Sequence, residues 1–216
     1  EFLKTRGVPV FSADAEIARA YEPGNDGHRL LRLHYGDRFV PSLHDAVNKH
    51  LLGSAMREND CLRREIENLL HPLIWHSLKK FWASDEAALH GIAVAEIPLY
   101  LESGQRDADL SLAEECRPVL VGVHCPFQLR EQRLLSKRGW TQDLIASMES
   151  WQWPEEAKIA ACAMVVNNTG TLDELDAESM RLAYALAGLR LQRARTGLSR
   201  VSRFWDSGPE VLCPSL

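Results

Sequence analysis

Two apolar runs constrain the fold of this chain most strongly, because neither run alternates between polar and apolar residues. They are GIAVAEIPL at 91–99 and VLVGV at 119–123. Runs of this kind are typical of central strands in a parallel sheet, where helices cover both faces. Two shorter apolar segments, 8–11 and 164–166, indicate further strands. Because helical patterns separate these strands, we predict an α/β protein with a mainly parallel sheet and helices on both faces.

Residues 7–19, GVPVFSADAEIAR, are typical of a buried strand that ends at small residues and is followed by a helix. Asp14 then stands at the carboxyl end of the strand, where open α/β sheets bind their ligands. A carboxylate in this place is a candidate general base. The alternative is an acid that caps the helix or interacts with its dipole, and position alone supports both interpretations.

The region 26–82 carries helical patterns only, so we predict a helical lobe there. Gly53 and Ser54 are expected to end one helix, and Pro72 is expected to separate two others. The predicted helices are 26–35, 43–52, 57–70 and 73–82.

A basic helix is predicted from residue 127 to residue 137, with Gly139 as its stop. Its basic residues lie about one turn apart, and they are Arg130, Arg133, Lys137 and Arg138. An arginine-rich face suits polyphosphate, because guanidinium groups bind phosphate oxygens in pairs. The alternative is a solvated helix face with ordinary ion pairs.

Charge and composition exclude several classes of protein. The net charge is −5, so no overall field favours nucleic acid or an anionic membrane. No apolar run reaches the ~18 residues of a membrane-spanning helix. The five cysteines are scattered without a CxxC pair, which argues against a zinc site and favours reduced thiols. We therefore expect a cytoplasmic protein with no membrane or nucleic-acid partner and no metal site of its own side chains.

A few other polar residues are candidates for a site. Glu96 and Glu102 bracket Pro98, and a carboxylate after a buried strand can bind a magnesium shell or a substrate hydroxyl. Strand-end caps or ion pairs are the alternative for both. His71 directly precedes Pro72, and the other seven histidines are expected to be structural.

The C-terminal part is predicted to be one long helix followed by a tail. Thr171 and Glu174 form a capping box for a helix that extends to about Thr196. Residues 197–216 show no clear period. We therefore expect one domain over 1–196 and a tail that is partly disordered.

Taken in order, the motifs of this chain resemble those of the dephospho-coenzyme A kinases, P-loop kinases of the nucleoside-monophosphate-kinase type. The matching segments are VPVFSADAEIAR (8–19), YEPG (21–24), LLRLHYG (30–36), LLHPLI (69–74), VAEIPLYLESG (94–104), VHCPFQLREQRLLSKRG (123–139), QWPEEAK (152–158) and VVNNTGTLDEL (165–175). The set HPLI, IPLxxESG and NNxG is the most specific part. The resemblance implies a three-layer P-loop kinase-type parallel sheet, a helical acceptor-binding lobe at about 26–82 and a lid at about 127–160.

The resemblance also implies an activity and its partners. Members of this family transfer the γ-phosphate of ATP to the ribose 3′-hydroxyl of dephospho-CoA, the last step of coenzyme A synthesis. ATP would bring Mg²⁺, and the protein would be a monomer or a small homo-oligomer. Carried over by motif, Asp14 would accept the hydroxyl proton and Arg133 would stabilise the transferring phosphoryl group.

The remaining site residues also follow from the resemblance. The residues implied for acceptor binding are Arg19, His71, Pro98, Leu99 and Glu102. Those implied for the lid and for ATP binding are Arg133, Arg138, Asn168 and Gly170.

The chain departs from the family pattern at several acids. Ser12 replaces the first acid of Asp-x-Asp, and Asn48-Lys49 stands where Asp-Arg is common. Ala163 and Asn167 replace two aspartates of the usual ADYVIDN run.

The phosphate-binding motif GxxxxGK[ST] does not occur in the 216 residues, and neither does the strand that would lead into it. Residues 1–6 resemble the end of the helix that such a loop opens. We therefore expect an N-terminally truncated kinase that is inactive unless the loop is restored. The alternative is a non-catalytic relative that binds CoA or nucleotide and has lost the loop. The replacements at Ser12, Ala163 and Asn167 motivate this alternative.

Overall fold

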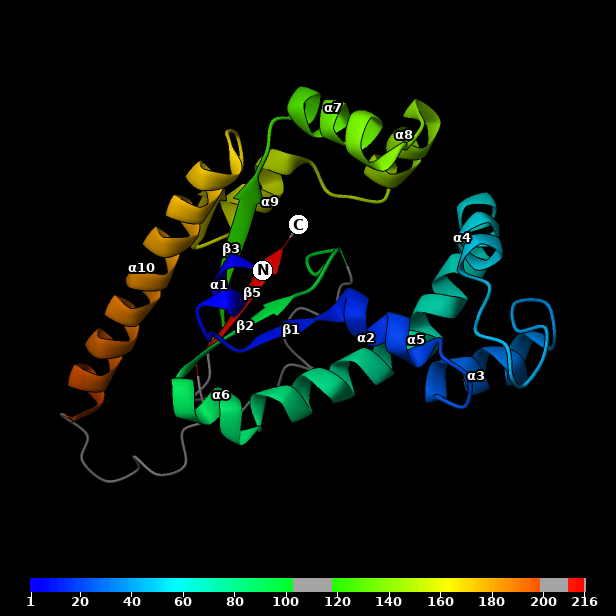
Figure 1. Ribbon diagram of the computed structural model, residues 1–216, viewed down its shortest axis with the longest axis horizontal. Coiled ribbons are helices and arrows are strands. Elements are labelled where there is room, and N and C mark those ends of the chain that lie inside the picture. Colours follow the sequence, from blue (N-terminus) through cyan, green and yellow to red (C-terminus); the bar gives the residue numbers. More distant parts are fainter. Residues whose placement is uncertain (103–117, 199–209, 216) are drawn as a thin grey trace. The chain divides into compact units, whose positions relative to one another are not determined.

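The computed structural model describes residues 1–102, 118–198 and 210–215, which form two units (Figure 1). One unit contains the sheet and comprises Glu1–Phe11 and Lys80–Leu216. The other unit is helical and comprises Ser12–Lys79. Over the described ranges, no helix combines the length and the apolar character needed to cross a bilayer.

The sheet has the strand order β1-β2-β5-β3-β4. All four strands predicted from the sequence are confirmed: β1 (Val10–Ser12), β2 (Ile92–Glu96), β3 (Val119–His124) and β4 (Met164–Asn167). β3 and β4 are parallel, with Val121 opposite Met164 and His124 opposite Asn167. The α/β class and its parallel sheet are therefore confirmed, although β2 ends earlier than predicted, before Pro98.

A fifth strand, β5 (Glu210–Ser215), lies in the centre of the sheet and was not predicted. It runs parallel to β2, with Ala93 opposite Val211, and parallel to β3, with Leu120 opposite Cys213. Pro214 explains the omission, because a proline argues against a central strand. The expectation of a partly disordered tail falls mainly on 199–209 and 216, which lie outside the described residues.

Helices cover both faces of the sheet. Val121 and Gly122 are neighbours in β3, so they face opposite sides. Val121 packs in a core with Leu186, while the Cβ position of Gly122 lies 3.0 Å from Cδ1 of Ile159 and 3.1 Å from Sγ of Cys162. The helices of this unit are α1 (Phe2–Thr5), α6 (Asp85–His90), α7 (Phe127–Arg138), α8 (Gln142–Ser150), α9 (Glu155–Ala161) and α10 (Leu172–Leu198). Leu186 belongs to α10 and Ile159 to α9, so these two helices lie on opposite faces.

Substituting Gly122 tests this packing. Gly122→Ala is expected to lower the free energy of unfolding by about 1–3 kcal/mol, because the added methyl group displaces Ile159 or Cys162. Gly188→Ala is the control, since its Cβ meets no described atom within 4 Å. It is expected to stabilise α10 by up to about 1 kcal/mol through helix propensity. Urea denaturation measures both effects, and an equal gain at the two sites would contradict the packing.

The helical unit packs around its own apolar core. Its helices are α2 (Ala13–Ala20), α3 (Asp26–Tyr35), α4 (Lys49–Glu58) and α5 (Asp60–Trp82), the last of which runs on into the sheet unit. The core consists of buried side chains that include Leu31, Phe39, Val40, Leu52 and Ile66. The prediction of helices throughout this region is confirmed in outline.

Several predicted helix boundaries in this unit are wrong. The helix expected at 43–52 begins at Lys49, where Oδ1 of Asn48 caps it by accepting the N–H of Leu51 at 3.0 Å. Gly53 and Ser54 lie inside this helix, because the burial of Leu52 and Ala55 outweighs the cost of ~1 kcal/mol for a glycine.

Pro72 does not end a helix either, since α5 continues through it to Trp82. Leu70, Ile74 and Leu78 follow one another at four-residue spacing, and all three are buried. This continuous apolar stripe offsets the cost of about 3 kcal/mol of a proline inside a helix.

Candidate functional site

Arg133 joins the basic helix α7 to the turn after β4. Its Nη1 donates to the carbonyl oxygen of Asn168 at 2.7 Å and to Oδ1 of the same residue at 2.9 Å. Its Nη2 donates to the carbonyl oxygen of Gly170 at 2.8 Å, and Nη1 also lies 3.6 Å from Sγ of Cys125. The structure thus brings together three residues that the sequence assigned to ATP binding.

The turn that contacts Arg133 is fixed by the start of α10. The predicted capping box is confirmed: the N–H of Thr171 donates to Oε2 of Glu174 at 2.7 Å, and the N–H of Glu174 donates to Oγ1 of Thr171 at 3.2 Å. The first of these hydrogen bonds lowers the pKa of the Glu174 carboxyl. A Cβ on Gly170 would lie 1.9 Å from Oε2 of Glu174, so a side chain there would disrupt the cap.

The residues predicted for acceptor binding in the sheet unit lie in the turn after β2. Pro98 is exposed, and Leu99 is half-buried with φ +57°, a left-handed conformation that is uncommon outside glycine. The N–H of Glu102 donates to the carbonyl oxygen of Leu99 at 3.1 Å and closes the turn. Unusual backbone conformations of this kind cluster at functional sites.

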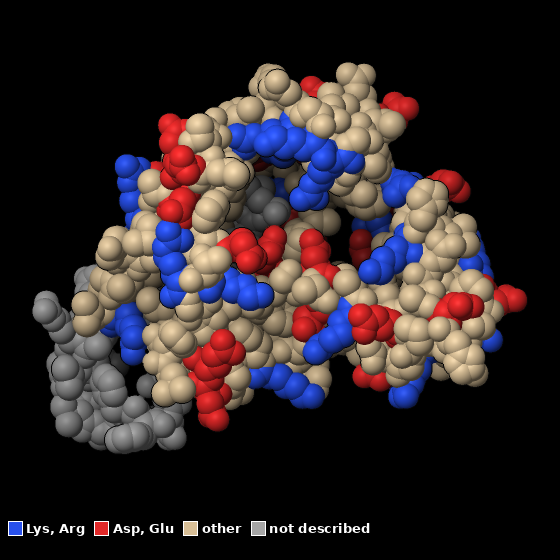
Figure 2. All heavy atoms as spheres, in the orientation of Figure 1, with Lys and Arg blue, Asp and Glu red and all other residues tan. Residues whose placement is uncertain are grey.

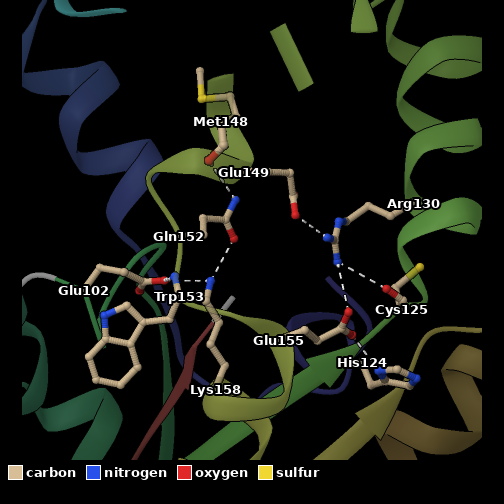
Figure 3. A network of polar contacts seen from close by, with 10 residues as sticks. All are labelled: Glu102, His124, Cys125, Arg130, Met148, Glu149, Gln152, Trp153, Glu155 and Lys158. Atoms are coloured by element: carbon tan, nitrogen blue, oxygen red, sulfur yellow. Dashed lines mark hydrogen bonds and ion pairs between the residues drawn. The ribbon is translucent and has the colours of Figure 1, made fainter. Parts of the chain in front are cut away.

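A buried lysine fixes the end of this turn (Figure 3). Lys158 in α9 is 1% exposed, and its Nζ lies 2.8 Å from Oε1 of Glu102. The same ammonium donates to Oε1 of Gln152 at 2.7 Å. Oε1 of Glu102 also accepts the backbone N–H of Trp153 at 2.8 Å. Sequence reasoning identified Glu102 but missed Lys158, because an ion pair between distant segments leaves no local pattern.

A second network ties α7 to α8 and α9 (Figure 3). Arg130 donates to Oε2 of Glu149 at 2.7 Å and to the carbonyl oxygen of Cys125 at 3.2 Å, and its Nη1 lies 3.7 Å from Oε2 of Glu155. Nδ1 of His124 lies 2.6 Å from Oε1 of Glu155. Arg130 is thus engaged in ion pairs, which agrees with the structural alternative for this member of the basic helix.

The end of α7 presents its charge to solvent. Lys137 and Arg138 are exposed in the last turn, before Gly139 ends the helix with φ +64°. Figure 2 shows Lys and Arg side chains gathered over the part of the view where α7 lies in Figure 1. In the described residues, the arginine that is hydrogen-bonded to the turn at Asn168 is Arg133 and not Arg138.

Asp14 belongs to the helical unit, where it lies exposed in the first turn of α2. The helix is capped by Ser12, whose Oγ accepts the N–H of Ala15 at 3.4 Å. Within the described part of the chain, no hydrogen bond or ion pair holds the Asp14 carboxylate. The capping role therefore belongs to Ser12, and Asp14 keeps only a favourable interaction with the helix dipole.

The other two predicted residues of the helical unit differ in their surroundings. Arg19 is exposed and pairs with Glu16, while its carbonyl oxygen accepts Nδ2 of Asn25 at 2.7 Å. Burial lowers the pKa of His71 in α5, and the nearby carboxylate of Glu67 partly opposes this effect. The His71 imidazole is therefore neutral near pH 7.

Residues that replace family acids take other roles. Ser12 and Asn48 are helix caps, of α2 and α4. The side chain of Asn167 is exposed, and its N–H donates to Oε2 of Glu178 at 3.3 Å. In the described ranges, no group of three or more His, Cys, Asp and Glu side chains could hold a metal ion.

Comparisons with known proteins point to one family. A family model described as CoaE: Dephospho-CoA kinase matches residues 1–174. The dephospho-CoA kinase of Thiobacillus denitrificans is 30% identical over 180 residues, which cover 81% of this chain and 83% of that protein. The dephospho-CoA kinase of Lactobacillus johnsonii is 25% identical and covers 82% of this chain and 84% of its own length.

Solved structures show the same fold. TT1252 from Thermus thermophilus superposes with a TM-score of 0.66 at 24% identity, over 85% of this chain and 87% of that one. Dephospho-CoA kinase from Campylobacter jejuni gives a TM-score of 0.54 at 19% identity, over 86% and 89%.

Proposed function

Because this chain belongs to the dephospho-CoA kinase family, we propose that it transfers the γ-phosphate of ATP to the ribose 3′-hydroxyl of dephospho-CoA. Membership of the family shows that it is a kinase of coenzyme A biosynthesis. What we propose in addition is the acceptor atom and the role of each residue. The observation that carries the proposal is the joining of Arg133 to Asn168 and Gly170, since residues of two motifs that are separated in the chain meet there.

In the proposed reaction the 3′-oxygen forms a bond to the γ-phosphorus while the bond from that phosphorus to ADP breaks. Asp14 accepts the proton of the hydroxyl. Three features support it in this role: it follows a strand end, its carboxylate is exposed, and Ser12 rather than Asp14 caps the helix. A base within reach of the hydroxyl assists the attack by removing its proton as the bond forms.

Arg133 and the turn at 168–170 act on the ATP side. A guanidinium group can donate paired hydrogen bonds to phosphoryl oxygens, and its charge offsets the charge of the transferring group. Mg²⁺ would come with ATP, where it neutralises phosphate charge and takes most of its ligands from phosphate and water.

The acceptor is tested with the full-length gene product, ATP and dephospho-CoA, with ADP and CoA measured as products. A dephospho-CoA analogue without the 3′-hydroxyl is the matched control, and we expect no turnover of it beyond the background ATP hydrolysis. Phosphorylation of a simple nucleoside but not of dephospho-CoA would contradict the proposed acceptor.

The alternative is a relative that binds nucleotide or CoA without turnover. It is motivated by Ser12, Ala163 and Asn167, which stand where the family pattern has acids. Calorimetry and the product assay together separate the two functions. The alternative predicts that calorimetry detects binding of ATP and CoA while the assay detects no product. We further propose a cytoplasmic monomer or small homo-oligomer, and the free thiols of Cys61 and Cys125 suit a reducing compartment.

A further inference from the structure

The starting point is the most deeply buried charge among the described residues of the sheet unit. Lys158 is 1% exposed, and lysines are almost never so buried unless they are paired. Its partners are Glu102, which ends the turn after β2, and Gln152, which lies between α8 and α9. One ammonium group therefore links two segments that are far apart in the chain.

The link is double, because both segments also contact each other directly. Oε1 of Glu102 accepts the backbone N–H of Trp153 at 2.8 Å while it faces Nζ of Lys158 at 2.8 Å (Figure 3). The charge of Lys158 thus holds the Glu102 carboxylate where it can accept the amide of Trp153. Removing that charge would leave a poorly solvated carboxylate, which is unfavourable.

The turn that Glu102 ends contains a residue with an unfavourable backbone conformation. Leu99 lies in it at φ +57°, a conformation that persists only where the surroundings hold it. Its carbonyl oxygen accepts the N–H of Glu102, so a displacement of Glu102 would release Leu99 as well.

We propose that Lys158 is a positioning residue that couples the acceptor-side turn, Pro98–Glu102, to the segment at Gln152–Trp153, which lies within the predicted lid at about 127–160. This rests on the proposed function, in which Pro98, Leu99 and Glu102 bind the acceptor. The coupling fixes the acceptor turn and the Gln152–Trp153 segment against each other. Lys158 itself touches no substrate.

Hydrogen exchange tests the coupling without any substrate. In Lys158→Met, amide exchange is expected to rise by about tenfold or more in both 98–102 and 150–156, because each segment loses the same anchor. Arg6→Met is the matched control: it breaks the Arg6–Asp176 ion pair of the same unit and should leave both segments unchanged. A rise in one segment only would overturn the coupling.

Kinetics test the consequence for the acceptor. Lys158→Met is expected to lower kcat/KM for dephospho-CoA by about 10- to 100-fold and to change the KM for ATP by less than about twofold. If the wild-type protein does not phosphorylate dephospho-CoA, the proposed function fails, and the exchange experiment still decides the coupling.

A double variant separates positioning from stability. Lys158→Met with Glu102→Gln removes both charges, so its melting temperature should recover toward the wild-type value. The kcat/KM for dephospho-CoA should stay below that of Glu102→Gln alone, which reports the loss of Glu102 itself, since the link between the two segments is still absent. Recovery of kcat/KM together with the melting temperature would show that Lys158 is only structural and would overturn the proposal.

Discussion

Asp14→Asn is expected to lower kcat for dephospho-CoA phosphorylation by about 10²–10⁴-fold, the usual contribution of a general base. Asparagine keeps the size of the side chain but cannot accept the hydroxyl proton. The fold should be preserved, because Ser12 and not Asp14 caps α2. Steady-state kinetics at saturating ATP and dephospho-CoA measure the effect, with little change expected in either KM.

Asp26→Asn is the matched control for this substitution. Asp26 is another exposed aspartate in the first turn of a helix of the same unit, α3. Both substitutions remove one charge near a helix N-terminus and should change stability similarly, by less than about 1 kcal/mol. A kcat for Asp14→Asn within about twofold of wild type would reject Asp14 as the base, and an equal loss in Asp26→Asn would attribute the effect to charge alone.

The strands that could be predicted are those in which consecutive apolar residues indicate burial on both faces. GIAVAEIPL and VLVGV are apolar without alternation, and both contain strands of the parallel sheet. The capping box at Thr171 and Glu174 was likewise predictable, because both of its partners lie within one turn.

Features that depend on distant partners were not predictable. β5 contains Pro214, which local rules exclude from a central strand, yet it pairs with β2 and β3 on its two sides. Pro72 similarly breaks a local rule inside α5, where the buried stripe of Leu70, Ile74 and Leu78 decides the outcome. In both places tertiary packing outweighs the preference of a single residue.

The candidate site likewise contains residues that motifs identify and residues whose role depends on distant partners. Arg133, Asn168 and Gly170 were assigned through motif order, and the structure brings them within hydrogen-bonding distance. Lys158 belongs to a matching segment, QWPEEAK, but its burial and its pairing with Glu102 exist only in three dimensions. The basic helix shows why composition is not enough, since Arg130 is held in ion pairs while Arg138 is exposed.

Arg133→Ala is expected to lower kcat by about 10³–10⁵-fold, the range for an arginine that stabilises a transferring phosphoryl group. Arg133→Lys should recover little of this loss, because an ammonium group cannot reproduce the paired N–H geometry. In the structure, Arg133 donates to Asn168 and Gly170, so the proposed role requires it to exchange these contacts for phosphate oxygens when ATP binds.

The split between kcat and KM decides which role of Arg133 matters. If Arg133 only shapes the turn at 168–170, Arg133→Ala should raise the KM for ATP and leave kcat within about tenfold of wild type, far from the loss expected for phosphoryl stabilisation. Arg181→Ala is the matched control, since Arg181 is an exposed arginine of the same unit whose ion pair with Glu178 within α10 contributes little. A large fall in kcat for Arg133→Ala, with Arg181→Ala unchanged, would place the guanidinium at the phosphoryl group, because only an interaction made in the transition state lowers kcat at saturating substrate.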